Sequence, residues 1–160
     1  MTDISVTAPA IGESITDFTA DTSEGTFRLS EHIGKQVVLY FYPKDNTPGC
    51  TTQAQGFRDL HDKFTAAGAI VVGVSRDTAA SHARFTEKQN LPFTLIADTD
   101  EALCRQFDVI KMKNMYGKQV RGIVRSTFLI DPAGKLAREW RNVKVPGHVE
   151  EVLRAVQEHG

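Results

Sequence analysis

One cysteine stands where an apolar run gives way to a helical pattern, in the stretch YPKDNTPGCTTQAQG of residues 42–56. Thr47 is a favoured N-cap residue and Pro48 suits the first position of a helix, so Cys50 falls at the third position. The unpaired N–H groups and the positive dipole end of that first turn stabilise a thiolate. Because Ala54 follows on the same helix face, we expect the Cys50 side chain in a partly dry pocket. The spacing therefore predicts a reactive thiolate.

Three other uses of Cys50 fit the sequence less well. A small buried hydrophobe would not need the N-cap, the proline and the strand-to-helix junction that surround it. A zinc site is disfavoured because the chain has no Cys-x-x-Cys and its 5 histidines are scattered without ligand spacing. A Cys/His hydrolase would need a base, and His61 lies on the same predicted helix face but about three turns away.

The segments around this junction predict a buried sheet with parallel strands. Two continuous apolar runs rich in β-branched residues, VVLYFY and AIVVGVS, are typical of central strands. Apolar residues at helical spacing follow each run, which implies parallel strands joined by helices. The predicted strands cover residues 37–42, 69–75 and 94–98, and the predicted helices cover residues 48–66 and 78–89.

The two ends of the chain carry different patterns. Residues 17–29 predict two short strands around a Ser-Glu-Gly turn. Asp98 and Asp100 are predicted to cap a short helix through Phe107, and residues 108–121 are predicted to be irregular. Strands are expected over 123–130 and 135–142, joined by an Asp-Pro-Ala-Gly turn, and a last helix is expected with Val149, Val152, Leu153 and Val156 on one face.

Together these elements predict an α/β protein with a thioredoxin-like fold. Its mixed central sheet would have helices on both faces and a β-hairpin at the N-terminus. The 160 residues suit one domain, and the sequence has no repeat or long linker, so we expect residues 1–160 to form a single domain.

Composition and charge exclude several classes of function. The net charge of −1 gives no general attraction to nucleic acid or to an anionic membrane. No apolar run approaches the ~20 residues of a membrane span, and the first residues lack the basic and apolar regions of a secretory signal. Two cysteines cannot build a disulfide-rich scaffold, so we expect a reducing, cytoplasmic setting.

One basic stretch stands apart from this balance. A nucleic-acid patch would be accompanied by a series of aromatic residues for base stacking, which is missing here. We therefore predict a solvated loop that raises the electrostatic potential near the thiolate. Between Asp108 and Asp131 there is no acidic residue, and the cationic ones are Lys111, Lys113, Lys118, Arg121 and Arg125.

The motif Pro43-x-x-x-Thr47-x-x-Cys50 resembles the active-site pattern of the peroxiredoxins. The longer string YPKDNTPGCTTQAQGFRD is similar to that of the bacterioferritin comigratory protein branch, also called peroxiredoxin Q. The likeness extends along nearly the whole chain, through VVGVSRD, the segment 98–107, RSTFLID and the C-terminal GHVEEVL. A Pro-Thr-Cys pattern with a later arginine before a strand is highly specific.

This resemblance implies a peroxidase that needs no metal or organic cofactor. Cys50 would be the peroxidatic thiolate, which attacks the O–O bond of a hydroperoxide and becomes a sulfenic acid. Thr47 would hydrogen-bond the peroxide and the thiolate, and Pro43 would shield the sulfur from water. Arg125 would hold the thiolate and polarise the leaving oxygen. From its residue type alone, Arg125 fits equally well as an arginine near a strand start with a solvated head.

The thiol that would reduce the sulfenic acid is missing from its usual places. The branch that this chain resembles often has a resolving cysteine five residues after the first or on the following helix, where Gln55 and Thr86 stand here. The other thiol is Cys104, either a buried inert group or a resolver that would need its Cα within ~7 Å of that of Cys50. We therefore expect a one-cysteine mechanism in which glutathione, glutaredoxin or thioredoxin is the external reductant.

Other cycles and functions stay open at this point. A transient intermolecular disulfide through Cys50 is a variant of the same mechanism. A redox-sensing or holdase-like binding protein would oxidise Cys50 quickly but show little turnover. A disulfide oxidoreductase of the thioredoxin type is disfavoured, because Thr47 occupies the first position of a would-be Cys-x-x-Cys. The resembled branch is often monomeric and no extended apolar surface stands out, so we expect a monomer.

Overall fold

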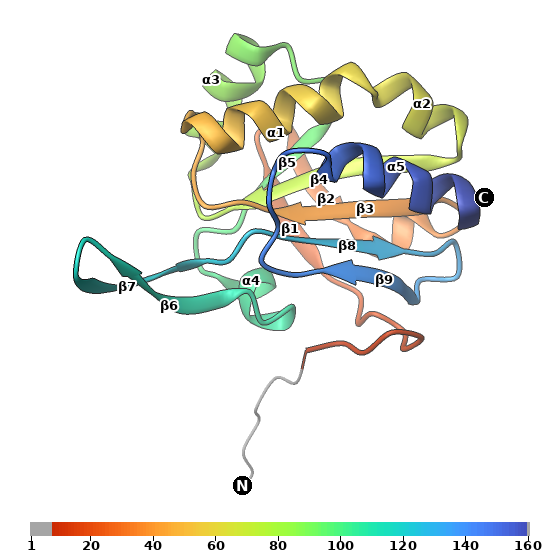
Figure 1. The fold of residues 1–160 in the computed structure, drawn as a ribbon. Coiled ribbons are helices and arrows are strands. Elements are labelled where there is room, and N and C mark those ends of the chain that lie inside the picture. The colour runs from red at the N-terminus through yellow and green to blue at the C-terminus, as the bar shows by residue number, and fades with distance from the viewer. Residues whose placement is uncertain (1–7, 160) are drawn as a thin grey trace, which may run out of the picture.

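The computed structural model describes residues 8–159, and within that range seven strands form one central sheet (Figure 1). Its three middle strands, β5, β4 and β3, are parallel, and every other neighbouring pair is antiparallel. The mixed sheet and the N-terminal hairpin of β1 and β2 confirm the predicted thioredoxin-like fold. The order across the sheet is β2 (Gly25–Arg28), β1 (Thr19–Thr22), β5 (Thr94–Ala97), β4 (Ala69–Ser75), β3 (Gln36–Phe41), β8 (Ser126–Ile130) and β9 (Leu136–Trp140).

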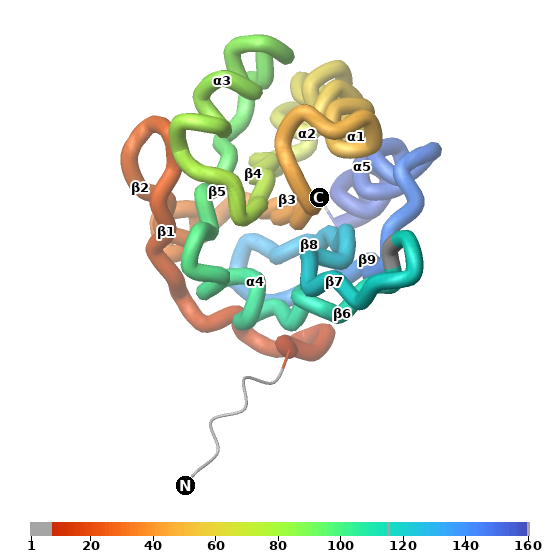
Figure 2. Tube along the Cα trace, turned by 90° about the vertical axis from the view of Figure 1, so that its left-hand side faces the viewer, coloured from red at the N-terminus to blue at the C-terminus, as the bar shows by residue number. Residues whose placement is uncertain are grey.

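Helices cover both faces of the sheet, as predicted. Four of them lie on one face and the short α4 lies on the other, which Figures 1 and 2 show from two directions. A short 3-10 helix, Leu29–His32, follows β2. The helices are α1 (Pro48–Asp59), α2 (His61–Ala66), α3 (Ala79–Gln89) and α5 (His148–His159) on the first face, and α4 (Ala102–Gln106) on the second.

The sheet divides the interior into two hydrophobic cores. Successive side chains of a strand point to opposite faces, and all six residues of β3 are buried. Val38 and Tyr40 enter the first core, beneath α1 and α5, whereas Val37 and Leu39 enter the second, with α4. This burial on both faces explains why β3 is a continuous apolar run in the sequence.

The predicted helix over residues 48–66 is interrupted at Leu60. Its backbone there has φ −101° and ψ 8°, so the chain forms two helices in place of one. Phe64, on the second helix, is thereby fully buried in the first core. The first helix also packs close to α5, because a Cβ added to Gly56 would lie 3.0 Å from a methyl group of Val149.

The expectation of an irregular segment over residues 108–121 is wrong. Antiparallel strands β6 (Ile110–Met115) and β7 (Lys118–Ile123) form a hairpin that projects from the body of the molecule (Figure 1). Tyr116 and Gly117 both have positive φ, which is the two-residue turn that matches the twist of a hairpin. The strand predicted over 123–130 consequently begins only at Ser126.

The carboxylate of Glu101 ties this hairpin to the sheet. It accepts hydrogen bonds from Arg121 of β7 and from Arg76, which follows β4. The Arg121 hydrogen bond is the main cause that holds the pKa of Glu101 at about 2. Next to Glu101, the Asp98 carboxylate accepts hydrogen bonds from the N–H groups of Leu103 and Cys104. The Asp100 carboxylate accepts one from the N–H group of Ala102. The predicted capping of the short helix α4 by these two aspartates is therefore confirmed.

Among the helices of residues 8–159, none is both long and apolar enough to cross a membrane.

Candidate active site

Cys50 occupies the third position of α1, as predicted, with Pro48 at the first. Thr47 precedes the helix in an extended conformation, and its carbonyl accepts the Thr51 N–H at 2.8 Å. The Cys50 side chain is buried in the first core, with 2% of the residue exposed. The thiol therefore lies at the positive end of a helix and largely out of water.

Arg125 reaches this thiol from a segment 75 residues away. It follows the projecting hairpin and precedes β8, and the pairing of Ser126 with Phe41 brings it beside the end of β3. Its Nη2 lies 3.4 Å from the Cys50 sulfur. A Cβ added to Gly49 would lie 3.2 Å from the same Nη2, so the helix start leaves the guanidinium little spare room. The structure thus brings two of the predicted site residues into direct contact.

Gln53 is part of this arrangement, and the sequence did not reveal it. Its Oε1 accepts a hydrogen bond of 2.6 Å from Arg125 Nη1, which orients the guanidinium toward the sulfur. The side chain is fully buried, and its Nε2 has no hydrogen-bond partner among the described residues. A signal was available, because Gln53 follows Cys50 by three residues and so shares its helix face.

Thr47 and Pro43 lie next to the thiol along the chain, and both are half-buried. We predicted that Thr47 caps the helix, but its hydroxyl makes no capping hydrogen bond. It donates instead to the Lys44 carbonyl, at 2.9 Å. Its lone pairs therefore remain free to accept a hydrogen bond from a ligand. Pro43 directly follows Tyr42, whose N–H pairs with the Val74 carbonyl at the end of the sheet.

The hairpin also carries a lysine, Lys113, whose pKa is sensitive to the charges of the site. Burial lowers the pKa of Lys113, as does the positive charge of Arg125, whereas the charge of Cys50 acts in the opposite direction. Of the other predicted basic residues, Arg121 pairs with Glu101 and Lys111 pairs with Asp108. The basic stretch is thus a hairpin, and the pKa of its Lys113 responds to the charges of Arg125 and Cys50.

Cys104 lies in a different part of the molecule. It is fully buried in the second core, so the sheet separates it from Cys50. Burial raises the pKa of the Cys104 thiol far above its usual value, and the neighbouring Asp98 carboxylate raises it further. The fold therefore does not bring the two thiols together.

An apolar groove of about 500 Å³ lies beside the helix that carries Cys50. Pro48 and Gly49 line it from the first turn of α1, and the segment 145–150 lines it from the opposite side. A hydrophobic group bound in this groove would therefore lie next to the residues that precede the thiol.

The sequence is related along its whole length to proteins of known family. The AhpC/TSA family model matches residues 11–139. Peroxiredoxin Bcp of Xanthomonas campestris pv. campestris is 52% identical over 160 residues, which cover 99% of this chain and 98% of that protein. Peroxiredoxin Bcp of Bacillus subtilis is 49% identical over 149 residues, which cover 92% of this chain and 95% of that protein.

Solved structures show the same relationship. Peroxiredoxin Q of Xanthomonas campestris has a TM-score of 0.85 and 53% identity, covering 89% of this chain and 90% of that one. A serine mutant of PrxQ from Xylella fastidiosa has a TM-score of 0.90 and 44% identity, covering 96% and 98%. Trapped intermediate and ligand complexes of the Xanthomonas bacterioferritin comigratory protein, which address its alkyl peroxide reduction activity, have a TM-score of 0.84 and 52% identity, covering 89% and 91%. This chain belongs to the AhpC/TSA family and, within it, to the Bcp or peroxiredoxin Q branch of the peroxiredoxins.

Proposed function

We propose that Cys50 carries out the thiol-dependent reduction of hydroperoxides that is characteristic of this family. The observation that carries the proposal is the contact of 3.4 Å between the Arg125 guanidinium and the Cys50 sulfur, at the first turn of a helix. A fixed cation and a helix N-terminus both stabilise a thiolate. Alkyl peroxide reduction has been studied in a Xanthomonas relative that is 52% identical to this chain.

In the first step, the Cys50 thiolate attacks the outer oxygen of the hydroperoxide. A sulfur–oxygen bond forms as the O–O bond breaks, so the sulfur is oxidised to a sulfenic acid and the alcohol leaves as an alkoxide that takes a proton from water. Arg125 faces the charge that moves from the sulfur to the departing oxygen. Because Gln53 already holds the guanidinium, little reorganisation is needed during the reaction. Thr47 accepts the hydrogen bond of the peroxide O–H, and Pro43 shields the sulfur.

In the second step, an external thiol reduces the sulfenic acid. The thiol displaces water to give a mixed disulfide with Cys50, and a second thiol releases Cys50 as a new disulfide forms. Glutathione, glutaredoxin and thioredoxin can each supply these thiols. The burial of Cys104 in the opposite core supports this one-cysteine cycle.

The setting that suits this cycle is the cytoplasm, where such thiols are kept reduced. We expect both hydrogen peroxide and organic hydroperoxides to react. The apolar groove beside α1 supports the second class, because an alkyl group can lie there while its peroxide reaches the thiol. We expect the enzyme to work as a monomer.

The test is peroxide consumption with dithiothreitol as the reductant. Cys50→Ser is expected to abolish turnover, since the serine hydroxyl is not ionised at neutral pH. Cys104→Ser is the matched control, and it should keep turnover within about twofold. Persistent turnover in Cys50→Ser would disprove the proposal. Rapid oxidation of wild-type Cys50 without turnover, whatever the thiol, would indicate a redox sensor instead of an enzyme.

A further inference from the structure

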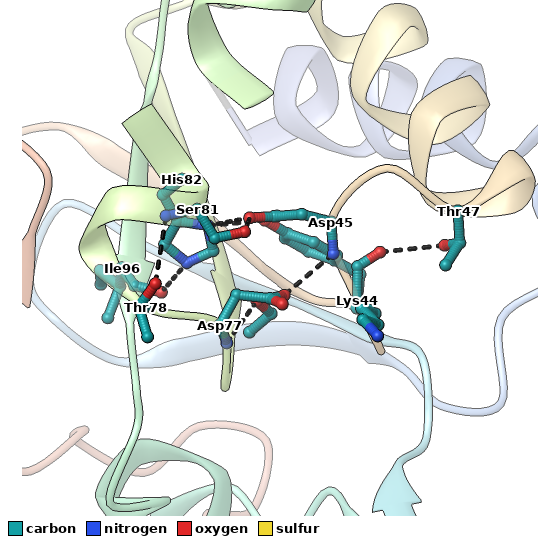
Figure 3. Close-up of polar contacts among 10 residues, drawn as sticks. Lys44, Asp45, Thr47, Asp77, Thr78, Ser81, His82 and Ile96 are labelled. Carbon is teal, nitrogen blue, oxygen red and sulfur yellow. Dashed lines mark hydrogen bonds and ion pairs between the residues drawn. The ribbon is translucent and has the colours of Figure 1, made fainter. Parts of the chain in front are cut away.

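A buried polar cluster lies beneath the turn that leads into α1 (Figure 3). At its centre, His82 Nδ1 of α3 lies 2.7 Å from Asp45 Oδ2. The histidine is fully buried and Asp45 is 6% exposed. The two residues are 37 positions apart in the sequence. The histidines show no functional spacing in the sequence, so this contact was not predicted.

The acceptors around this pair determine where its protons lie. His82 Nε2 is 2.9 Å from the Ile96 carbonyl, which can only accept, so Nε2 carries a proton. The Asp45 carboxylate also accepts from the Ser81 hydroxyl at 2.8 Å and the Tyr42 hydroxyl at 2.5 Å. Burial opposes the ionisation of Asp45, but the His82 and Tyr42 hydrogen bonds outweigh it and lower the pKa of that carboxyl.

The same residue is also held through its backbone. The Asp45 N–H donates to Asp77 Oδ2 at 2.9 Å, and Asp77 in turn accepts from the Ser75 hydroxyl. Asp45 is therefore attached to the end of β4 by its main chain and to α3 by its side chain. The next residue, Asn46, adopts a positive φ of 67°, which completes a tight turn.

This turn also orients the Thr47 hydroxyl, which the proposed mechanism places next to the peroxide. The carbonyl that accepts the Thr47 proton belongs to Lys44, the neighbour of Asp45 (Figure 3). Fixing Asp45 therefore fixes the direction of the Lys44 carbonyl and, through it, the rotation of the Thr47 hydroxyl. With the proton directed at Lys44, the lone pairs are left for the substrate.

We propose that the buried Asp45–His82 pair is a positioning element of the peroxide site, which acts on the substrate through the turn 44–47 and the Thr47 hydroxyl. The inference rests on the proposed function and adds to it two residues that do not touch the reacting atoms. Preorganised hydrogen-bond geometry contributes to rate because small misplacements of a reactive group are costly.

Two other roles explain the cluster less well. Asp45, Asp77 and His82 are of metal-ligand type and lie close together, but the carboxylate and imidazole atoms that would bind a metal already make hydrogen bonds of 2.5–2.9 Å with the protein. A purely structural role would not require this set of buried hydrogen bonds, since buried polar pairs are often no more stabilising than apolar packing. Asp45 is itself a residue of the turn 44–47, so its bond to His82 points to a role in that turn.

The experiment is a double-mutant cycle on the rate of Cys50 oxidation by hydrogen peroxide, followed by stopped flow. Asp45→Ala is expected to lower the second-order rate constant about 10- to 100-fold. Thr47→Val, which removes the hydroxyl at nearly constant shape, should lower it by a similar or larger factor. If Asp45 acts through Thr47, adding Asp45→Ala to Thr47→Val should change the rate less than about threefold.

Two further readouts separate positioning from a general loosening of the fold. Alkylation of Cys50 by iodoacetamide does not use the Thr47 hydroxyl, so Asp45→Ala should leave it within about threefold of wild type. Asp45→Asn should recover most of the peroxide rate, because its amide can donate to His82 Nδ1 while the ring keeps its bond to the Ile96 carbonyl. Thr78→Ala is the matched control, since it deletes the N-cap bond of α3 without touching Asp45.

Clear results overturn the inference. It fails if Asp45→Ala reacts within twofold of wild type, if the two rate losses multiply in the double variant, or if alkylation falls in parallel with the peroxide rate. It fails equally if Thr78→Ala loses as much rate as Asp45→Ala. If Asp45→Ala does not fold, Tyr42→Phe replaces it in the experiment, because it removes one hydrogen-bond donor to Asp45. This change should lower the peroxide rate about threefold, and only when the Thr47 hydroxyl is present. Wild-type protein that consumes no peroxide would instead contradict the proposed function.

Discussion

At the scale of single residues, the orientation of Arg125 depends on one neighbour. Gln53 Oε1 accepts from one nitrogen of the guanidinium and leaves the other nitrogen directed at the Cys50 sulfur. An arginine without this anchor can sample several rotamers, and each rotamer that turns away removes a positive charge from beside the Cys50 sulfur. The reactivity of Cys50 should therefore depend on Gln53, which acts through Arg125.

Gln53→Leu tests this dependence. We expect the rate constant of Cys50 oxidation by peroxide to fall about tenfold, because Arg125 loses its 2.6 Å hydrogen bond. Stability should not fall, since the change also removes a buried amide nitrogen that has no partner among the described residues. Stopped-flow oxidation and thermal melting measure the two effects. Gln55→Leu, which breaks a bond to Gln89 away from the site, should keep the rate within twofold. An unchanged rate in Gln53→Leu would contradict the anchoring role.

At the scale of elements, α5 is docked onto the sheet by a buried histidine. His148 Nε2 lies 2.8 Å from the Thr127 hydroxyl of β8, and the Trp140 ring of β9 packs edge-on against the imidazole. Burial is the main cause that lowers the pKa of His148 to about 4, although Glu151 acts in the opposite direction. The imidazole is therefore neutral in the folded protein at neutral pH.

This docking predicts a loss of stability in mild acid. The unfolded chain binds a proton at His148 below about pH 6.5, while the folded chain resists it until about pH 4. Stability from this residue is therefore complete above pH 6.5 and declines as the pH falls toward 4, by about 3 kcal/mol at most. Urea denaturation at pH 7 and pH 4.5 measures the decline. His148→Gln should make this loss of stability smaller, whereas His61→Gln, at a half-exposed position, should not change it. An equal loss of stability between pH 7 and pH 4.5 in wild type and in His148→Gln would refute the prediction.

Elements that pack on the cores were predictable, and the projecting hairpin was not. Burial on both faces forces the apolar runs of β3 and β4, and burial on one face forces the helical spacing of α3 and α5. In β7, four of the six residues are exposed, so no apolar pattern marks it. Its pairing depends on a turn in which Tyr116 and Gly117 both have positive φ. A tyrosine rarely adopts positive φ, so the sequence did not predict this turn.

The same reason limits what could be predicted of the site. Cys50 and Arg125 were predicted as site residues because a family motif marks both, and the structure places them in contact. Gln53 and His82 were missed because a polar residue on a helix ordinarily indicates a solvent-exposed face, and both are fully buried here. The spacing of three residues from Cys50 places Gln53 on the same helix face, but the partners of both residues, Arg125 and Asp45, come from distant segments that local spacing does not reveal.

At the scale of the whole molecule, the central sheet is a barrier between the two thiols. Cys50 belongs to the core under α1 and α5, and Cys104 belongs to the core that contains α4. A disulfide requires Cα atoms within about 7 Å, which two buried residues on opposite faces can reach only if much of one core opens. The raised pKa of Cys104 adds a chemical barrier, because a protonated thiol does not attack a sulfenic acid.

Intact mass spectrometry with thiol trapping after one equivalent of peroxide tests this barrier. The native protein is expected to gain one oxygen, or to form a dimer linked through Cys50, because Cys104 is held away. Cys104→Ser should oxidise at the same rate within about twofold. Oxidation in concentrated denaturant is the positive control, since unfolding removes the sheet and lets the two thiols meet. A native monomer that loses two hydrogens would reveal an intramolecular disulfide, and it would require a rearrangement that carries one cysteine across or around the sheet during each catalytic cycle.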